Sequence, residues 1–385
     1  MMLPSLRIME KSETSMLKKI NFRYYNFILI FLVISLMLLG LYVINDVNND
    51  YTVKQAVGIV LAIIIMIVLS LIDYHFIVKF YVPLYLSSVL LLVAVIIGGT
   101  SVNNAKRWFT IAGIRFQPSE LTKVLMIIFM AVFLGNLMED KRVNTFRGIV
   151  GFGIFYAIPA GLIFIEPDLS TLICLTMVLL TMIFLAGLSY KFIITVLLIL
   201  IPVFSIFIWY IQQPDQKLLY EHQVTRIMSF IYPSEYDDET MQQDNSVMAI
   251  GSGQLMGKEF GESKKNSKTS DTNLISEQQT DFIFSAVGEK FGFFGSVIII
   301  GIILLIVLQC IRAGRQARDN VGTLIGVGVG CLIGYQSFIN IGVATKLLPN
   351  TGIPLPFISY GLTSLISTAI GIGIVLNICL QKRRY

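Results

Sequence analysis

Long apolar runs separated by short polar segments dominate the pattern of this chain. A helix needs about 20 mostly apolar residues to cross a bilayer. Runs of that kind lie near residues 26–44, 55–72, 76–97, 119–138, 148–165, 169–187, 191–211, 282–311, 321–343 and 358–380. The pattern therefore predicts an all-α polytopic membrane protein with about ten transmembrane helices.

One long polar segment interrupts this alternation. Residues 212–280 separate the seventh run from the eighth and include an acidic run and a Lys- and Ser-rich stretch of disordered composition. Within it, residues 245–258 combine helical apolar spacing with glycines, which predicts that this part folds against the membrane face. We therefore expect a leader over 1–25 and one membrane domain over 26–385, with a single long loop.

Basic residues fall on one side of the membrane if the predicted helices alternate strictly. They are found in the leader and at Lys141, Arg142, Arg147, Lys191, Arg312, Arg315, Arg318 and Lys382 to Arg384. Because cytoplasmic loops carry an excess of Lys and Arg, both termini are predicted to be cytoplasmic. The segments 98–118, 166–168, 212–280 and 344–357 then face outward.

Composition agrees with a membrane protein and narrows the chemistry. Of the 385 residues, 55% are hydrophobic and 14% charged, whereas soluble domains carry about 25% charged residues. The formal charge of +5 is modest, so nothing indicates a nucleic-acid partner. The four cysteines lie in apolar runs without CxxC spacing, and the two histidines are far apart, so neither a disulfide framework nor a metal cluster is predicted.

Asp281 is the first candidate for chemistry, because it lies where the long polar segment ends and an apolar run begins. A carboxylate at the mouth of a membrane helix is costly unless a cavity, a cation or a substrate keeps it hydrated or paired. Helix capping is the structural alternative. Asp168, after Pro167 in a tight hairpin, has the same two interpretations, with capping favoured.

Cations and a further acid lie near the same predicted face. Glu120 and Lys123 share one helix face three residues apart, as a structural ion pair or as part of a site. Arg107 precedes Trp108, an arrangement typical of an interfacial anchor or of a site for a phosphate headgroup. Lys54 lies at the start of the second run.

Four ordered segments resemble the signatures of the SEDS family of shape, elongation, division and sporulation proteins, which includes RodA, FtsW and SpoVE. They are Lys106–Phe109 with Phe116–Lys123, Glu166–Thr171, Gln279–Phe284 with Gly288–Gly292, and Asn350–Gly361. The resemblance covers nearly the whole chain. Residues 250–255 and 277–280 look more like the RodA branch than the others.

The resemblance implies an inverting peptidoglycan glycosyltransferase. Such an enzyme polymerises lipid II on the outer face of the bacterial cytoplasmic membrane and works with a class B penicillin-binding protein. By this resemblance Asp281 matches the catalytic acid, Glu120, Lys123 and Asp168 carry over as supporting residues, and Lys54 matches a family cation more loosely. The sequence departs from the family pattern at Ser170, Lys346 and Leu362.

A mechanism follows from the resemblance as a hypothesis. Asp281 acts as general base on the 4-hydroxyl of the acceptor, and the departing undecaprenyl pyrophosphate needs cations. Lys54, Arg107 and Lys123 are the outward cations for that role, and a divalent ion such as Mg²⁺ or Mn²⁺, held by acids, is a further candidate beside them. Two rival functions stay open, a flippase for the lipid-linked precursor and a scaffold for a crosslinking enzyme, as does the choice among elongation, division and sporulation.

Overall fold

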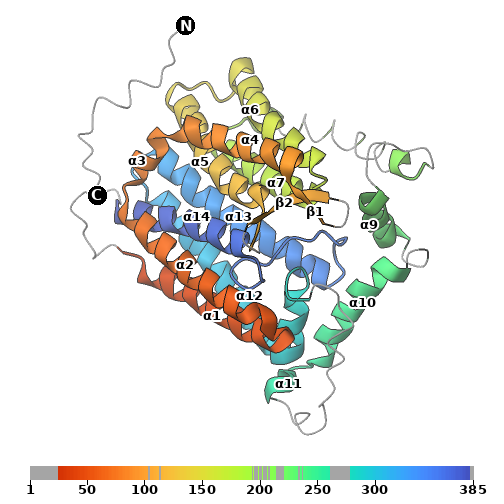
Figure 1. Cartoon of the computed structure of the whole chain (residues 1–385). Coiled ribbons are helices and arrows are strands. Elements are labelled where there is room, and N and C mark those ends of the chain that lie inside the picture. The colour runs from red at the N-terminus through yellow and green to blue at the C-terminus, as the bar shows by residue number, and fades with distance from the viewer. Residues whose placement is uncertain are drawn as a thin grey trace.

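The computed structural model describes residues 25–102, 105–111, 114–192, 209–213, 221–232, 237–260 and 278–381, with the single residues 194, 198, 202, 206 and 235. It is a bundle of long helices with one small sheet (Figure 1). The leader, most of the predicted span 191–211 and much of the long loop lie outside these residues.

The helices follow the apolar runs closely. In chain order they are α1 (Phe27–Val47), the 3-10 turn η4 (Asn49–Tyr51), α2 (Thr52–Leu71), α3 (Tyr74–Lys79), α4 (Tyr81–Gly98), α5 (Pro118–Glu139), α6 (Phe146–Ile165), α7 (Leu169–Leu185), α9 (Glu221–Ile231), α10 (Asp237–Ser252), α11 (Gly257–Phe260), α12 (Ile283–Arg315), α13 (Asn320–Ala344) and α14 (Leu362–Leu380).

Eight of the described helical segments are long and apolar enough to cross a membrane, and α7 is a shorter apolar helix of 17 residues. The prediction of a polytopic helical membrane protein is therefore confirmed. Several predicted boundaries differ by a few residues, as at the end of α12, which is Arg315 instead of 311. The third run is divided between α3 and α4, because Phe80 leaves helical geometry, and the last helix begins at Leu362 instead of 358.

Three helices form the centre of the bundle. Of the 18 most apolar consecutive residues of each helix, 72% are buried in α5, 72% in α13 and 83% in α14. The corresponding share is 22% to 28% in α2, α4, α6 and α12. Close packing at the centre depends on small residues. A Cβ on Gly326 of α13 would lie 2.7 Å from the backbone of Gly314 in α12, so these two helices approach within a distance that side chains would prevent.

A small antiparallel sheet, which the sequence pattern did not predict, lies between α4 and α5. Its strands are β1 (Thr100–Val102), β2 (Ala105–Ile111) and β3 (Ile114–Phe116), in the order β1-β2-β3. The sheet, α9, α10 and α11 all lie at one end of the bundle, which we call the loop end (Figure 1). Helix α10 lies within the long polar segment 212–280 and includes part of residues 245–258.

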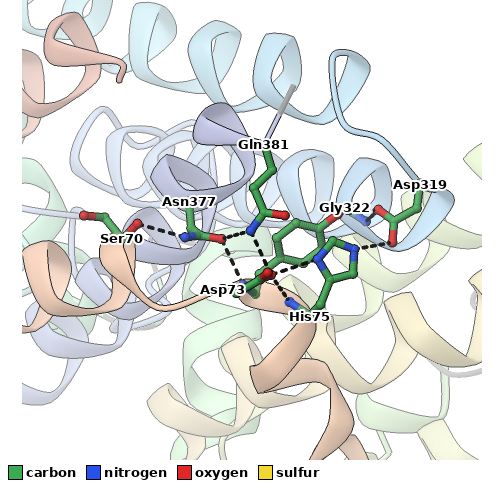
Figure 2. Close-up of polar contacts among 8 residues, drawn as sticks. Ser70, Asp73, His75, Asp319, Gly322, Asn377 and Gln381 are labelled. Atoms are coloured by element: carbon green, nitrogen blue, oxygen red, sulfur yellow. Dashed lines mark hydrogen bonds and ion pairs between the residues drawn. The ribbon is translucent and has the colours of Figure 1, made fainter. Parts of the chain in front are cut away.

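The opposite end of the bundle is tied together by a polar network (Figure 2). His75 Nδ1 lies 2.8 Å from Asp73 Oδ1, and Tyr74 donates a hydrogen bond of 2.6 Å to Asp319, the N-cap of α13. Gln381 after α14 donates to Asp73 over 2.7 Å, and Asn377 donates to the carbonyl of Ser70 in α2 over 2.9 Å. The adjacent helices α2 and α3 therefore meet α13 and α14, which are distant from them in sequence.

Candidate functional site

Asp281 lies at the loop end, immediately before α12, with its side chain half-buried. Its backbone carbonyl accepts a hydrogen bond of 2.8 Å from Asn340 Nδ2 of α13, and the same nitrogen donates to the carbonyl of Ile353 over 2.8 Å. One buried amide on a central helix thus fixes both the segment that carries Asp281 and the proline-rich segment beside it.

The proline-rich segment before α14 is held against the same stretch of backbone. Ser359 Oγ donates to the carbonyl of Thr280 over 2.7 Å, and the Tyr360 N–H donates to the carbonyl of Gln279 over 2.9 Å. These contacts flank Asp281 on its N-terminal side. The carboxylate therefore extends from a backbone that is fixed on both sides, which is the preorganisation that a reaction site requires.

Gly352 passes directly against the Asp281 carboxylate. Its φ is +74°, and a Cβ at this position would lie 3.2 Å from Asp281 Oδ2 and 3.7 Å from Arg226 Nη1. The position needs glycine for two reasons, its left-handed backbone and the lack of room for a side chain. Arg226 also donates to the carbonyl of Thr351 over 3.4 Å.

Arg226 is the site residue that the sequence reasoning missed. It lies on α9, within the segment that was expected to be loop. Burial lowers the pKa of Arg226, and the charge of Asp281 acts in the opposite direction, while Arg107 and Asp168 also lie close enough to influence it. Arg226 is therefore the charge around which three of the predicted residues gather.

A sequence signal for α9 existed in its apolar spacing. Val224, Ile227, Met228 and Ile231 follow the i, i+3, i+4, i+7 pattern of one helix face. In the structure Met228 packs with Ile211, and Phe164 at the end of α6 and Leu169 at the start of α7 are among the side chains that pack against them. This contact places α9 over the turn between α6 and α7.

Asp168 caps α7 and also joins it to α5. Its Oδ1 accepts from the Thr171 N–H over 3.2 Å, as the capping interpretation predicted. Its Oδ2 accepts from Gln117 Nε2 over 2.9 Å and from Ser119 Oγ over 3.2 Å. Ser170, a departure from the family pattern, donates over 2.5 Å to the carbonyl of Thr351.

Glu120 and Lys123 form a buried ion pair of 2.6 Å on α5, with only 3% and 1% of each residue exposed. The second oxygen of Glu120 has no hydrogen-bond partner among the described residues. The pair lies near Asp168, because Ser119, the neighbour of Glu120 on α5, donates to Asp168 Oδ2. Arg107 donates from Nε to the carbonyl of Glu166 over 3.0 Å and from Nη2 to the carbonyl of Pro167.

Lys54 is the predicted site residue for which the structure shows no contact with the other candidate site residues. It lies at the loop end, because its neighbour Gln55 donates over 3.3 Å to the carbonyl of Ser359. Its own side chain is exposed and makes no hydrogen bond or ion pair with the described residues. Across the described ranges no group of three or more His, Cys, Asp or Glu side chains is arranged to hold a metal ion.

Comparison with known proteins identifies the family. Residues 16–384 match the model of the FtsW, RodA and SpoVE family, described as "Cell cycle protein". The chain belongs to this family. The site residues described above all lie within the matched region.

Two relatives are named "Probable peptidoglycan glycosyltransferase FtsW". The one from Geobacter metallireducens is 30% identical, with 93% of this chain and 96% of the relative covered. The one from Bacillus subtilis is 29% identical, with 94% and 92% covered. Both names are of the FtsW branch, so the RodA-like branch stays a prediction.

Solved structures confirm the fold. A chain from "Structural coordination of polymerization and crosslinking by a peptidoglycan synthase complex" matches with a TM-score of 0.78 at 24% identity, over 92% of this chain and 97% of that one. The rod shape determining protein RodA of Thermus thermophilus matches with a TM-score of 0.68 at 24% identity, over 94% and 98%.

The other two departures from the family pattern also have contacts. Lys346, whose φ is +59°, forms an ion pair with Asp244 of α10. Leu362 packs against Gly58 of α2, where a Cβ would lie 2.2 Å from its Cδ2. Lys346 therefore joins the segment after α13 to α10, and Leu362 joins the start of α14 to α2.

Proposed function

We propose that this chain is an inverting peptidoglycan glycosyltransferase of the bacterial cytoplasmic membrane that polymerises lipid II at its outward face. The observation that carries the proposal is the Asp281 carboxylate, held by backbone contacts on both sides and placed beside Arg226. Family membership and the names of the relatives support the reaction class.

In this reaction Asp281 takes the proton of the acceptor's 4-hydroxyl group as that oxygen attacks the anomeric carbon of the donor chain. The bond from the anomeric carbon to the pyrophosphate oxygen breaks, and its electron pair leaves with undecaprenyl pyrophosphate. Positioned general bases accelerate such steps by about 10²–10⁴-fold. Because Asn340 and Ser359 fix the backbone on both sides of Asp281, the carboxylate needs little reorganisation.

The cations for the departing pyrophosphate are assigned by their contacts. Arg226 lies beside Asp281, and Arg107 keeps unused N–H donors after its two contacts with carbonyls. Lys123 is buried and neutralised by Glu120, so both support α5 instead of binding the pyrophosphate directly. Asp168 likewise has a structural role, because it caps the start of α7. Lys54 is exposed and is assigned to a lipid headgroup.

We also propose a class B penicillin-binding protein as the partner. A polymerase that makes glycan strands needs a second enzyme to crosslink them. One structural relative comes from a peptidoglycan synthase complex in which polymerisation and crosslinking are coordinated, and this supports the pairing.

The decisive experiment is polymer formation from fluorescent lipid II by purified protein with its partner, comparing wild type with Asp281→Asn. We expect a loss of at least about 100-fold, because amide nitrogen cannot accept the proton. Asp50→Asn, which alters an exposed acid of the 3-10 turn before α2, is the matched control and keeps full activity.

Wild-type rates in Asp281→Asn protein would contradict the base assignment. Translocation of lipid II in liposomes without any polymer would favour the flippase. Growth of cells that carry Asp281→Ala as their sole copy would favour the scaffold.

A further inference from the structure

Glu166 is a buried carboxyl group that the proposed reaction leaves unused. It lies between α6 and α7, and only 1% of the residue is exposed. Neither of its carboxyl oxygens has a hydrogen-bond partner among the described residues. Buried polar atoms are nearly always hydrogen-bonded, so a carboxyl group with two unpaired oxygens at a site needs an explanation.

The surroundings of Glu166 place it in the site. Arg107 of β2 binds the carbonyls of Glu166 and Pro167. Asp168 follows two residues later and caps α7. Arg226 of α9 lies close enough to both Arg107 and Asp168 for their charges to affect it. The turn that carries Glu166 is thus bound by Arg107, and the charges of Arg107 and Asp168 act on Arg226, the arginine beside Asp281.

The protonation state of Glu166 follows from this environment. Burial and then the charge of Asp168 raise the pKa of Glu166 to about 9, against the opposite influence of Arg107. At neutral pH the group is a carboxylic acid with one O–H donor. A neutral carboxyl held in this way can donate a hydrogen bond where a carboxylate would only accept one.

A neutral donor beside the guanidinium of Arg107 suits an anion with several acceptor oxygens. A charged Glu166 would repel phosphate oxygens and would also neutralise Arg107. We propose that Glu166 donates a hydrogen bond from its carboxylic acid to the diphosphate group of the lipid-linked donor, a role that rests on the proposed function. The proton stays on Glu166, while the electron pair of the broken bond from the anomeric carbon leaves with the diphosphate.

The first test is the pH profile of polymerisation between pH 6.5 and 10 for the full chain with its partner. For wild type we expect kcat/KM to fall about tenfold per pH unit above pH 9, because the carboxylate cannot donate. Glu166→Gln keeps an N–H donor and loses this descending limb. Glu166→Ala loses about tenfold or more at pH 7, and Glu139→Gln, an exposed acid at the end of α5, behaves as wild type.

The second test measures binding of undecaprenyl diphosphate, which carries no sugar, by the same variants in detergent. Wild-type affinity should weaken between pH 8 and 10, and that of Glu166→Gln should not. A descending limb in Glu166→Gln identical to wild type would overturn the inference, as would full activity of Glu166→Ala. If Glu166→Ala fails to fold, the Glu166→Gln profile decides.

The two tests separate this inference from the proposed function. Binding that depends on pH through Glu166, with no polymer formed by wild type, would count against the glycosyltransferase alone. Polymer formation with the same pH profiles in wild type and Glu166→Gln would count against the role of Glu166 alone. Loss of both polymer and diphosphate binding in wild type would overturn both.

Discussion

At the scale of single residues, the role of each charged group in the site depends on its neighbours and its burial. Asp281 and Arg226 come from separate segments and meet beside Gly352. Glu120 and Lys123 are close because they are one helical turn apart, so their pairing follows from the sequence. Their burial does not, since it depends on the helices that surround α5.

The buried pair on α5 supports a test that separates its structural role from a catalytic one. Lys123→Met leaves the Glu120 charge buried and unpaired, so we expect a loss of about 3–5 kcal/mol in the free energy of unfolding. The double variant Glu120→Gln with Lys123→Met should recover most of that loss. Thermal and denaturant unfolding in detergent measure both.

Polymerisation by the double variant then decides between the two interpretations that the sequence left open. Recovered stability with recovered activity identifies a purely structural pair. Recovered stability without activity shows that the charge of Lys123 serves the reaction. A single Lys123→Met variant as stable as wild type would contradict the buried pair itself.

At the scale of elements, the site is supported by close approaches of backbone. Gly40 of α1 lies against Ile358, where a Cβ would be 2.6 Å from the carbonyl oxygen and 2.7 Å from Cα. Ile358 precedes Ser359, which holds the backbone of Thr280. Helix α1, which carries none of the candidate site residues, thus positions the segment that carries Asp281.

Because of this contact, we expect Gly40→Ala to destabilise the protein and to lower its polymerisation rate. Because the neighbouring atoms are backbone, the segment at Ile358 must shift, and we expect a loss of about 1–3 kcal/mol. Gly153→Ala is the matched control, since a Cβ there meets nothing within 4 Å. Melting temperature and polymerisation rate check the effect, and equal behaviour of the two variants would contradict the contact.

At the scale of the whole molecule, the end opposite the site is held by charges of its own. His75 lies between Asp73 and Asp319, which belong to different parts of the chain (Figure 2). Burial alone would lower the pKa of His75, but hydrogen bonds and charges from Asp319 and Asp73 outweigh it and raise the pKa to about 9. A charged His75 therefore stabilises the junction of α3, α13 and α14.

The sign of the resulting pH dependence follows from the raised pKa. Because the folded-state pKa lies above the unfolded value of about 6.5, this contribution is fully present below pH 6.5 and is lost as the pH rises through about 9. We expect His75→Gln to lower the melting temperature at pH 6.5 and to differ much less from wild type at pH 10. His222→Gln controls for the loss of a histidine, and a constant difference over this range would contradict the network.

Much of the site could be predicted from the sequence because its residues occur in ordered motifs. Asp281, Asp168 and the pair on α5 were all identified as candidates, and they lie at the starts of α12, α7 and α5. Lys54 was also identified, but its side chain is exposed and lies outside the group. Arg226 and Glu166 were not among the candidates. Arg226 lies in a segment that the sequence predicts to be a loop, and in the hairpin of Glu166, Pro167 and Asp168 only Asp168 was considered for the site.

What the sequence by itself determined was the membrane class, the approximate helix positions and the candidate acids. These properties follow from local physics, since hydrocarbon requires long apolar runs and helical spacing fixes which neighbours share a face. Only the tertiary structure decided the burial of these charges and the partners that come from distant segments. Asp281 meets Arg226, and the carboxyl group of Glu166 is enclosed with no hydrogen bond to the described residues, because helices distant in sequence pack together and exclude water from the groups between them.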